Sequence, residues 1–266
     1  MTTVAEMLRD APSAEARRDF EVLLAHVLGV TRAYLYAHGD EILDSDHGHH
    51  IAHALEQYRR GTPVAYITGR REFWALTLDV SPAVLIPRPE TELLVELALQ
   101  RLSPNARVLD LGTGSGAIAL AIKHERGDCA VTATDVSADA IAVAKRNADR
   151  QQLDIDLRVG DWYVALDGAV EVIVSNPPYV RANDPHLSAL VGEPTLALVG
   201  GADGLDALRT IVSGAPRHLV HGGHLLVEHG FDQGGDVRRM FDCAGLRRVT
   251  THRDVAGHER VTLGER

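Results

Sequence analysis

Short apolar runs alternate with helical patterns from residue 106 onward in this 266-residue chain. Runs with so few polar residues, separated by helical segments, are typical of strands that are buried on both faces of a parallel sheet. The alternation therefore predicts an α/β fold, a Rossmann-like doubly wound and mostly parallel sheet. The strand predictions are residues 108–111, 130–134, 155–159, 170–174 and 225–227, and the helix predictions are residues 117–124 and 138–148.

The flanking segments have other patterns. Apolar residues recur at helical spacing over residues 20–28, where Gly29 suits the helix end, and a second helix is predicted over residues 51–58. Residues 72–80 alternate like a strand or hairpin, and residues 246–251 and 259–263 are predicted to form an antiparallel C-terminal hairpin at the sheet edge. We expect three parts: a small N-terminal helical domain over residues 1–70, a β-hairpin connector over 71–85, and an α/β domain over 86–266.

Composition excludes several classes of protein. No apolar run is long enough for a membrane helix, and the charged N-terminus has no secretory core. Two cysteines are too few for a disulfide framework or a thiolate metal cluster. The net charge of −10 weighs against direct binding of nucleic acid. We therefore expect a cytoplasmic protein that binds neither membrane nor nucleic acid directly.

His47, His49, His50 and His53 are candidates for a metal site. His49 and His53 have helical i, i+4 spacing, but no carboxylate or cysteine completes a ligand set. We interpret them as the solvated start of a helix and predict no metal.

A glycine-rich turn follows the first predicted strand. Glycines at a strand-to-helix turn allow a ligand to approach the main chain closely, at the carboxyl end of the sheet. The turn predicts a ligand site formed by Asp110, Gly112, Thr113, Gly114, Ser115 and Gly116.

The acidic residue before the glycines distinguishes two classes of ligand. Gly112, Gly114 and Ala117 just satisfy a dinucleotide fingerprint. A pyrophosphate would be repelled by Asp110, whereas a ligand with an amino group and a sulfonium would be attracted. This favours S-adenosylmethionine over a nicotinamide cofactor.

Two later strand ends supply further candidates for binding this ligand. Asp135, at the end of the second strand, can accept hydrogen bonds from ribose hydroxyls. Asp161 and Trp162, after the third strand, offer a carboxylate and an aromatic face for adenine.

The segment Asn176-Pro177-Pro178-Tyr179 ends a nearly apolar strand. Two prolines stiffen the loop and remove two N–H donors. The Asn176 side-chain oxygen and the Pro177 carbonyl can accept both hydrogens of a planar NH₂ group, and the Tyr179 ring can pack on its face. With no strong base in the motif, we expect positioning to dominate methyl transfer to such a nitrogen.

Together, DLGTGSG and NPPY resemble class I S-adenosylmethionine-dependent methyltransferases that modify planar amino groups. The stretches GTPVAYITG, REFW, LIPRPETE and GHLLVEHG resemble the release factor glutamine methyltransferases, the HemK/PrmC family, more specifically. One departure is Gly192, where the family usually has an aromatic residue before Glu193-Pro194.

The resemblance implies methyl transfer to the side-chain nitrogen, N5, of the glutamine in the Gly-Gly-Gln motif of bacterial peptide chain release factors. It implies that residues 86–266 are the methyltransferase domain and that the N-terminal helices engage the factor. We also expect a monomer. The methyl donor would contact the glycine turn, Asp135, Asp161, Trp162 and Asn176, and the substrate would contact Asn176, Pro177, Pro178, Tyr179, Phe73, Arg88, Thr91 and Glu193.

Three alternatives stay open at this point. NPPY is shared with nucleic-acid adenine-N6 methyltransferases, which would flip a base into the same clamp. The glycine turn also suits a nicotinamide oxidoreductase or a binding module without catalysis. Glu228 and His229, at a predicted strand end, suit either a catalytic role or a hydrogen-bonded pair near the sheet edge, and we interpret them as the pair.

Overall fold

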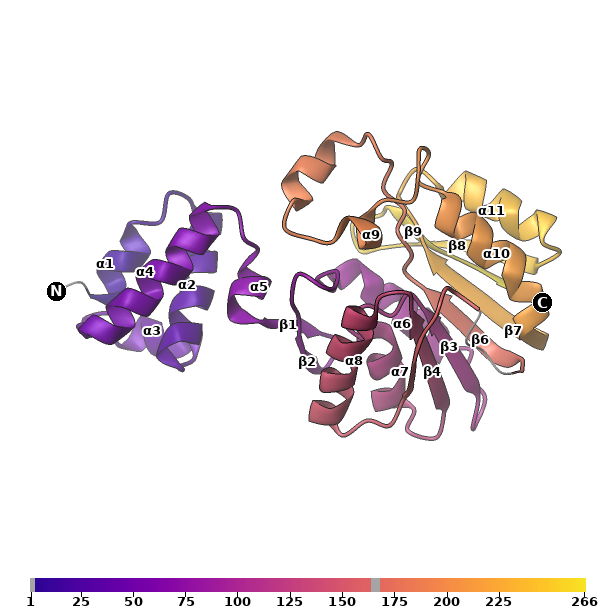
Figure 1. Ribbon diagram of the computed structural model, residues 1–266, viewed down its shortest axis with the longest axis horizontal. Helices are drawn as coiled ribbons and strands as arrows, with labels where there is room; N and C mark the ends of the chain where they lie inside the picture. Colours follow the sequence, from indigo (N-terminus) through magenta and orange to yellow (C-terminus); the bar gives the residue numbers. More distant parts are fainter. Residues whose placement is uncertain (1–2, 164–167) are drawn as a thin grey trace. The chain divides into compact units, whose positions relative to one another are not determined.

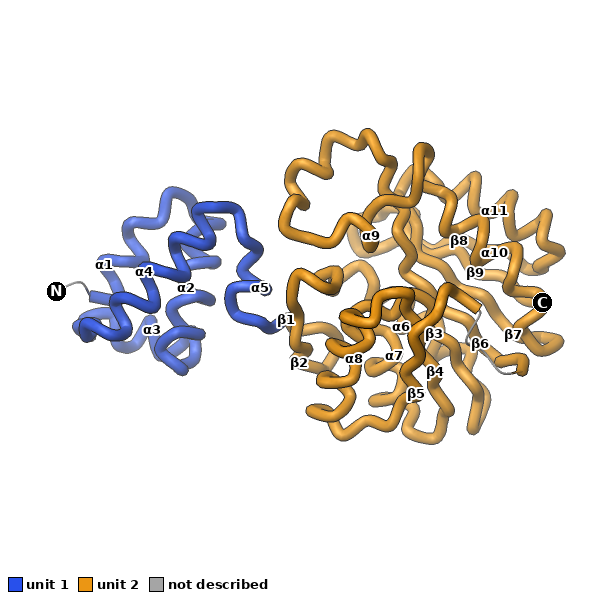
Figure 2. The backbone as a smooth tube through the Cα atoms, in the orientation of Figure 1, with its two compact units in different colours: residues 1–70 blue, residues 71–266 orange. Residues whose placement is uncertain are grey.

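The computed structural model describes residues 3–163 and 168–266, and the chain divides into two compact units, residues 1–70 and 71–266 (Figure 2). The first unit is helical, and its core contains Phe20, Leu24 and Ile51. As predicted, the helix over residues 20–28 ends at Gly29, which is left-handed (φ +67°). The helices of this unit are α1 (Val4–Arg9), α2 (Ala14–Leu28), α3 (Arg32–Ala37), α4 (Ser45–Arg59) and α5 (Val64–Thr68).

Helix α4 begins six residues earlier than the prediction of residues 51–58. Asp44 caps its N-terminus by accepting a hydrogen bond from the His47 amide (2.8 Å). The first turn is polar, so apolar spacing gave no signal there. His49 and His53 are exposed on this helix, and the described residues include no group of three or more side chains able to hold a metal ion.

The second unit contains a seven-stranded sheet with the order β5-β4-β3-β6-β7-β9-β8. Strands β3 to β7 are parallel, whereas β9 is antiparallel to both β7 and β8. This confirms the predicted doubly wound, mostly parallel sheet with an antiparallel C-terminal hairpin. The strands are β3 (Arg107–Leu111), β4 (Ala130–Asp135), β5 (Asp156–Val159), β6 (Val170–Ser175), β7 (Leu219–Glu228), β8 (Arg247–Arg253) and β9 (Glu259–Glu265).

Helices cover both faces of this sheet (Figure 1). In β3, Val108 packs in the cluster with α6 and α7, while its neighbour Leu109 packs in the cluster with α10 and α11. Both faces are therefore dry, which explains the continuous apolar runs in the sequence. No helix in the described residues is both long and apolar enough to cross a membrane. The helices are α6 (Glu92–Leu99), α7 (Ala117–Glu125), α8 (Ala138–Gln151), α9 (Thr195–Leu198), α10 (Asp206–His218) and α11 (Gly234–Cys243), with 3-10 turns at Pro89–Thr91 and Pro185–Leu190.

Strand order reverses between β3 and β6 because the chain first builds outward to β5 and then returns to the other side of β3. In open α/β sheets, ligands bind beyond the carboxyl ends of the strands at such a switch point. The glycine turn follows β3 and the NPPY segment follows β6. The topology therefore places the two motifs at the same edge.

A separate hairpin of β1 (Arg70–Phe73) and β2 (Leu76–Asp79) forms a two-stranded sheet, as predicted. Leu76 and Leu78 are buried in the core of the second unit. The fully buried Asn147 of α8 fastens the hairpin: its Oδ1 accepts from the Asp79 amide (2.6 Å), and its Nδ2 donates to the carbonyls of Asp79 (3.0 Å) and Ser115 (2.9 Å). One side chain thus joins the hairpin, α8 and the glycine turn.

Replacing Asn147 by alanine should lower the free energy of unfolding by about 2–3 kcal/mol, because buried backbone groups lose their partners. Urea unfolding measures the change. Lys145→Ala, an exposed substitution on the same helix, is the control and should change stability by less than about 0.5 kcal/mol. Equal effects of the two substitutions would contradict the role given to Asn147.

Candidate active site

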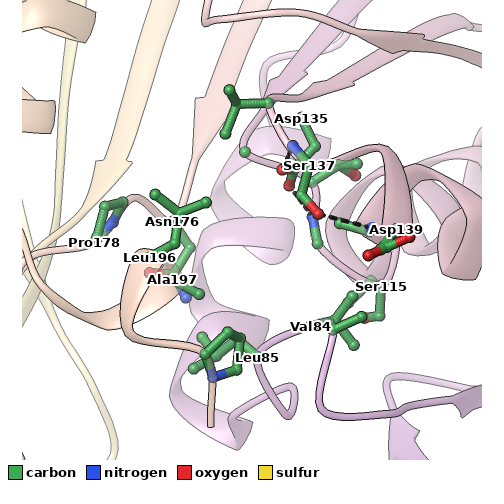
Figure 3. A pocket seen from close by; sticks show the side chains of 18 of the residues that line it. Val84, Leu85, Ser115, Asp135, Ser137, Asp139, Asn176, Pro178, Leu196 and Ala197 are labelled. Atoms are coloured by element: carbon green, nitrogen blue, oxygen red, sulfur yellow. Dashed lines mark hydrogen bonds between the residues drawn. The ribbon is translucent and has the colours of Figure 1, made fainter.

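A pocket of about 510 Å³ lies at the carboxyl ends of β3, β4, β5 and β6. Its size is in the ordinary range for small-molecule sites. Asp135, Ser137 and Asp139 form one wall, and Asn176, Pro178, Leu196 and Ala197 lie opposite them (Figure 3). Of the residues predicted from the sequence, Thr91, Gly112, Thr113, Gly114, Ser115, Asp135, Asp161, Trp162, Asn176 and Pro178 line this pocket.

The glycine turn is held against β4 by main-chain hydrogen bonds. The amides of Gly112 and Thr113 both donate to the Thr134 carbonyl at 2.9 Å. A Cβ at Gly114 would meet no atom within 4 Å, so the main chain there is open to a ligand. Gly116 does not line the pocket, because its Cα faces Leu120 and Ala144, where a Cβ would come within 3.1 and 3.2 Å of their side chains. Its small size leaves room for the side chains of Leu120 and of Ala144 on α8.

Asp135 joins the glycine turn to the start of α8. Its Oδ2 accepts from the Gly114 amide and its Oδ1 from the Ser137 amide, both at 2.9 Å. Burial raises the pKa of this carboxyl, and the two amide donors oppose the rise. Ser137 in turn caps α8 by accepting from the Ala140 amide (3.2 Å) (Figure 3).

Asp110 is fully buried and does not line the pocket. Its Oδ2 accepts from the Thr113 hydroxyl (2.7 Å). Burial raises the pKa of Asp110 to about 7. The carboxyl that the sequence suggested as a direct contact for a cationic ligand therefore lies behind Thr113.

The NPPY segment contributes two of its four residues to the pocket. Ser175 Oγ donates to the Leu111 carbonyl (2.7 Å) and so joins the end of β6 to β3. Asn176 lines the pocket and its Nδ2 donates to Thr91 Oγ1 (3.0 Å). Pro177 is buried, and Tyr179 packs against the α10–α11 core while its hydroxyl donates to Glu228 Oε1 (3.0 Å). Neither Pro177 nor Tyr179 lines the pocket.

Three residues expected to contact the substrate also lie outside the pocket. Phe73 is buried in the hydrophobic core. Arg88 and Glu193 form an ion pair, and Glu193 Oε2 also accepts from the Ile86 amide (3.0 Å). This pair fastens the segment that carries Pro194, Leu196 and Ala197 into the pocket wall.

Sequence reasoning missed several lining residues. Val84, Leu196 and Ala197 lie in no motif, and Leu85, although it begins the LIPRPETE stretch, was not predicted as a contact, since apolar side chains give no chemical signal. Asp139 had a usable signal: it is an acid in the first turn of the helix that follows β4.

Glu228 and His229 do not bond to each other, so that prediction was wrong. Glu228 accepts from Thr91 and Tyr179, whereas His229 contacts the Gly230 carbonyl (2.8 Å) and Thr262 Oγ1 (2.9 Å). Adjacent residues of a strand point to opposite faces of the sheet, which separates the two side chains.

The charges of the pocket indicate its ligand. Asp135, Asp139 and Asp161 line it, and none of its described lining residues is lysine or arginine. Anionic pyrophosphate would find no cation here, whereas a cationic ligand finds three carboxylates. The apolar surface of Val84 and Leu85 suits an aromatic base. The open main chain at Gly114 and these side chains fit S-adenosylmethionine.

Substituting Asp110 by asparagine should change how stability depends on pH. The raised pKa means that the folded protein holds a proton between about pH 4 and 7 that the unfolded chain has released. The wild type should therefore lose stability relative to Asp110→Asn as the pH rises through this range. Denaturant unfolding at several pH values tests this, with the exposed Asp154→Asn as control. A difference between wild type and Asp110→Asn that is independent of pH would refute the prediction.

Gly204 packs against the NPPY main chain. It is left-handed (φ +76°), and a Cβ there would lie 2.3 Å from the Tyr179 carbonyl oxygen. Gly222 has nearly the same φ (+77°) but open space around its Cβ position. Gly204→Ala should therefore cost about 2 kcal/mol more stability than Gly222→Ala, since only the first adds a clash with main chain to the conformational cost. Urea unfolding of both variants measures the difference, and equal costs would argue against tight packing at Gly204.

Comparison with known proteins identifies the family. Two family models match the chain: the PrmC N-terminal domain over residues 1–69 and the methyltransferase small domain over residues 89–193. A methyltransferase structure from Pyrococcus furiosus has a similar fold, with a TM-score of 0.57 and 20% identity over 80% of this chain and 98% of that one.

Full-length relatives are much more similar. The release factor glutamine methyltransferase of Xylella fastidiosa (strain Temecula1) is 50% identical over 270 residues, which cover 99% of this chain and 98% of the relative. That of Escherichia coli K12 is 47% identical over 257 residues, which cover 95% and 93%. With this identity along nearly its whole length, the chain belongs to the release factor glutamine methyltransferase family.

Proposed function

We propose that this protein transfers a methyl group from S-adenosylmethionine to the side-chain amide nitrogen, N5, of the glutamine in the Gly-Gly-Gln motif of peptide chain release factors. Membership of the family supports both the type of reaction, methyl transfer, and the glutamine side chain as the group that is methylated. The observation that carries the proposal is one acid-lined pocket bounded by both the glycine turn and Asn176.

The donor side of the site would be formed by the glycine turn, Asp135, Asp161 and Trp162. Bound S-adenosylmethionine supplies an electrophilic methyl carbon on a sulfonium. The carboxylates of Asp135 and Asp161 would attract its cationic groups or accept its hydroxyls, and the Trp162 ring offers a flat apolar surface. Asp110 and Gly116 would not contact the donor. They would stabilise the conformation of the glycine turn from the side away from the pocket.

The acceptor side would be formed by the NPPY segment. Because Asn176 Nδ2 is turned to Thr91, its Oδ1 is left to accept one hydrogen of the glutamine amide. The Pro177 carbonyl would accept the other. Tyr179 would support this loop through Glu228 rather than stack on the substrate.

Positioning would supply most of the rate enhancement. An amide nitrogen is a weak nucleophile because its lone pair is delocalised, and holding it in line with the methyl carbon reduces the entropic part of the barrier. Hydrogen bonds to both N–H groups raise the electron density on nitrogen. The NPPY segment itself contains no strong base, and Asp135 and Asp139 lie on the wall opposite Asn176 (Figure 3). As the C–N bond forms, the C–S bond would break and the donor would leave as the neutral thioether S-adenosylhomocysteine. The proton of the methylated nitrogen would leave late, to solvent, after the new bond has begun to form.

We also propose a role for each of the three parts of the chain. Residues 1–70 would engage the release factor, residues 71–85 would connect, and residues 86–266 would carry out methyl transfer. The enzyme would act as a monomer in the cytoplasm, without direct contact to nucleic acid.

Incubation with labelled S-adenosylmethionine and either a release factor or DNA tests the acceptor. We expect label in the factor, and mass spectrometry should find the mass of one added methyl group on the Gly-Gly-Gln peptide. Label in DNA and none in the factor would favour an adenine-N6 methyltransferase. Tight binding of NADH without binding of S-adenosylmethionine would favour an oxidoreductase.

Replacing Asn176 by alanine should reduce kcat by about 100-fold or more, since it removes one of the two acceptors that orient the amide. Affinity for the methyl donor, measured by calorimetry, should change by less than about threefold, because the donor is bound mainly by the opposite wall. Unchanged turnover would contradict the role of Asn176.

A further inference from the structure

A chain of hydrogen bonds runs from Asn176 into the core. Asn176 Nδ2 donates to Thr91 Oγ1 (3.0 Å), and Thr91 Oγ1 donates to Glu228 Oε2 (2.7 Å). The other oxygen of Glu228 accepts from the Tyr179 hydroxyl (3.0 Å). Of these four hydrogen-bonded residues, only Asn176 and Thr91 line the pocket.

The direction of this chain follows from its last member. A carboxylate can only accept hydrogen bonds, and a hydroxyl has a single hydrogen to donate. The hydrogen of Thr91 is therefore used on Glu228, and Thr91 can offer only a lone pair to Asn176. Only the NH₂ group of the Asn176 amide can donate a hydrogen bond to this lone pair. The Oδ1 atom is then the one that can accept a hydrogen bond from a bound substrate.

We propose that Glu228 is a positioning residue. Acting through Thr91, it determines which end of the Asn176 amide faces the substrate side chain. The site therefore selects an amide over a carboxylate. The inference rests on the proposed function. Glutamine and glutamate side chains have nearly the same shape, so the polarity of the clamp is what can distinguish them. An amide presents hydrogens to Oδ1, whereas a carboxylate would be repelled.

Each carboxylate oxygen of Glu228 accepts a hydrogen bond from a hydroxyl, which is the arrangement that the Glu228–Thr91–Asn176 relay needs. The carboxyl is fully buried, and burial raises its pKa. Hydrogen bonds from Thr91 and Tyr179 and the charge of Arg260 on β9 act in the opposite direction, while Glu90 adds to the rise. Both oxygens of the carboxylate are occupied by hydroxyl donors, so the buried charge is compensated.

Removing the relay should change specificity as well as rate. Thr91→Val keeps the shape and deletes the hydroxyl, and Glu228→Gln keeps the shape and adds a donor. In each variant the Asn176 amide becomes free to rotate by half a turn and present NH₂ to the pocket. A release factor carrying Gly-Gly-Glu should then bind better as an inhibitor.

The experiment measures kcat, KM for the release factor and affinity for S-adenosylmethionine with the full chain. For Thr91→Val and Glu228→Gln we expect kcat to fall at least about tenfold while donor affinity stays within about threefold. The inhibition constant of the Gly-Gly-Glu factor, relative to the KM of the Gly-Gly-Gln factor, should fall at least about fivefold. Thr91→Ser, which restores the hydroxyl, should recover most of the lost kcat.

Coupling between the two positions is the second measurement. Because both variants break the same chain, the double variant should lose little more kcat than either single one. Thr132→Val, at a half-buried position of β4 outside the network, is the matched control for a threonine-to-valine change and should keep the wild-type ratio of the two constants. Thermal unfolding of every variant separates misfolding from loss of the relay. If Glu228→Gln does not fold, the isosteric Thr91→Val decides by itself.

An unchanged ratio of the two constants in folded Thr91→Val, or no recovery in Thr91→Ser, would overturn the relay while leaving the methyltransferase intact. Failure of the unchanged protein to methylate the factor would overturn the proposed function and the relay with it.

Discussion

The hydrogen-bonded pair of parallel strands β3 and β6 is the constraint on which the site depends. Leu111 lies beside Ser175 in the register, and the Ser175 hydroxyl donates to the Leu111 carbonyl (2.7 Å). The next residues of each strand are Gly112 and Asn176. Two motifs more than sixty positions apart in the chain are thereby forced to the same edge, where one pocket includes both.

Buried polar side chains then hold the loops that the strands bring together. Asn147 binds main-chain groups of the hairpin and the glycine turn, and Glu193 binds the Ile86 amide. Gln233 Nε2 donates to the Tyr179 carbonyl (3.0 Å), and Glu228 holds Tyr179 and Thr91. Loops cannot satisfy their own main-chain groups as strands do, so each buried loop segment needs such a partner. The loop around Tyr179 and the segments that line the pocket are thereby held in place.

The sequence was sufficient to predict the sheet and many of the residues that line the pocket for a physical reason. Strands buried on both faces must be almost wholly apolar, and a ligand at their ends needs glycine and amide groups directly after them. Both patterns are local. The relation between Glu228 and Thr91 is not local, because 137 positions separate the two residues. Nothing in the short-range pattern around either residue shows the partner.

Two residues with suitable chemistry, Asp110 and Tyr179, do not line the pocket because their side chains are held in the interior. Asp110 has the right charge for a cationic ligand but is a strand residue, so its side chain follows the alternation of β3 into the core. Tyr179 has a suitable ring, but its hydroxyl needs a buried partner and finds it at Glu228. The prediction for strand β7 was too short. Its first half includes Gly222 and Gly223, which weaken the sequence pattern of a strand, although the sheet accommodates them.

The charge that a ligand would meet in the pocket depends on which arginines form ion pairs, not on how many arginines the chain contains. Arginines occur close to the site in the sequence, but Arg88 pairs with Glu193 and Arg181 with Asp232. Arg260 likewise pairs with the buried Asp254. Since these cations are held by carboxylates outside the pocket, the acids that line it keep their full effect on a ligand. The same glycine turn with an unpaired arginine would suit a phosphate; here the charged side chains among the described lining residues are all acidic.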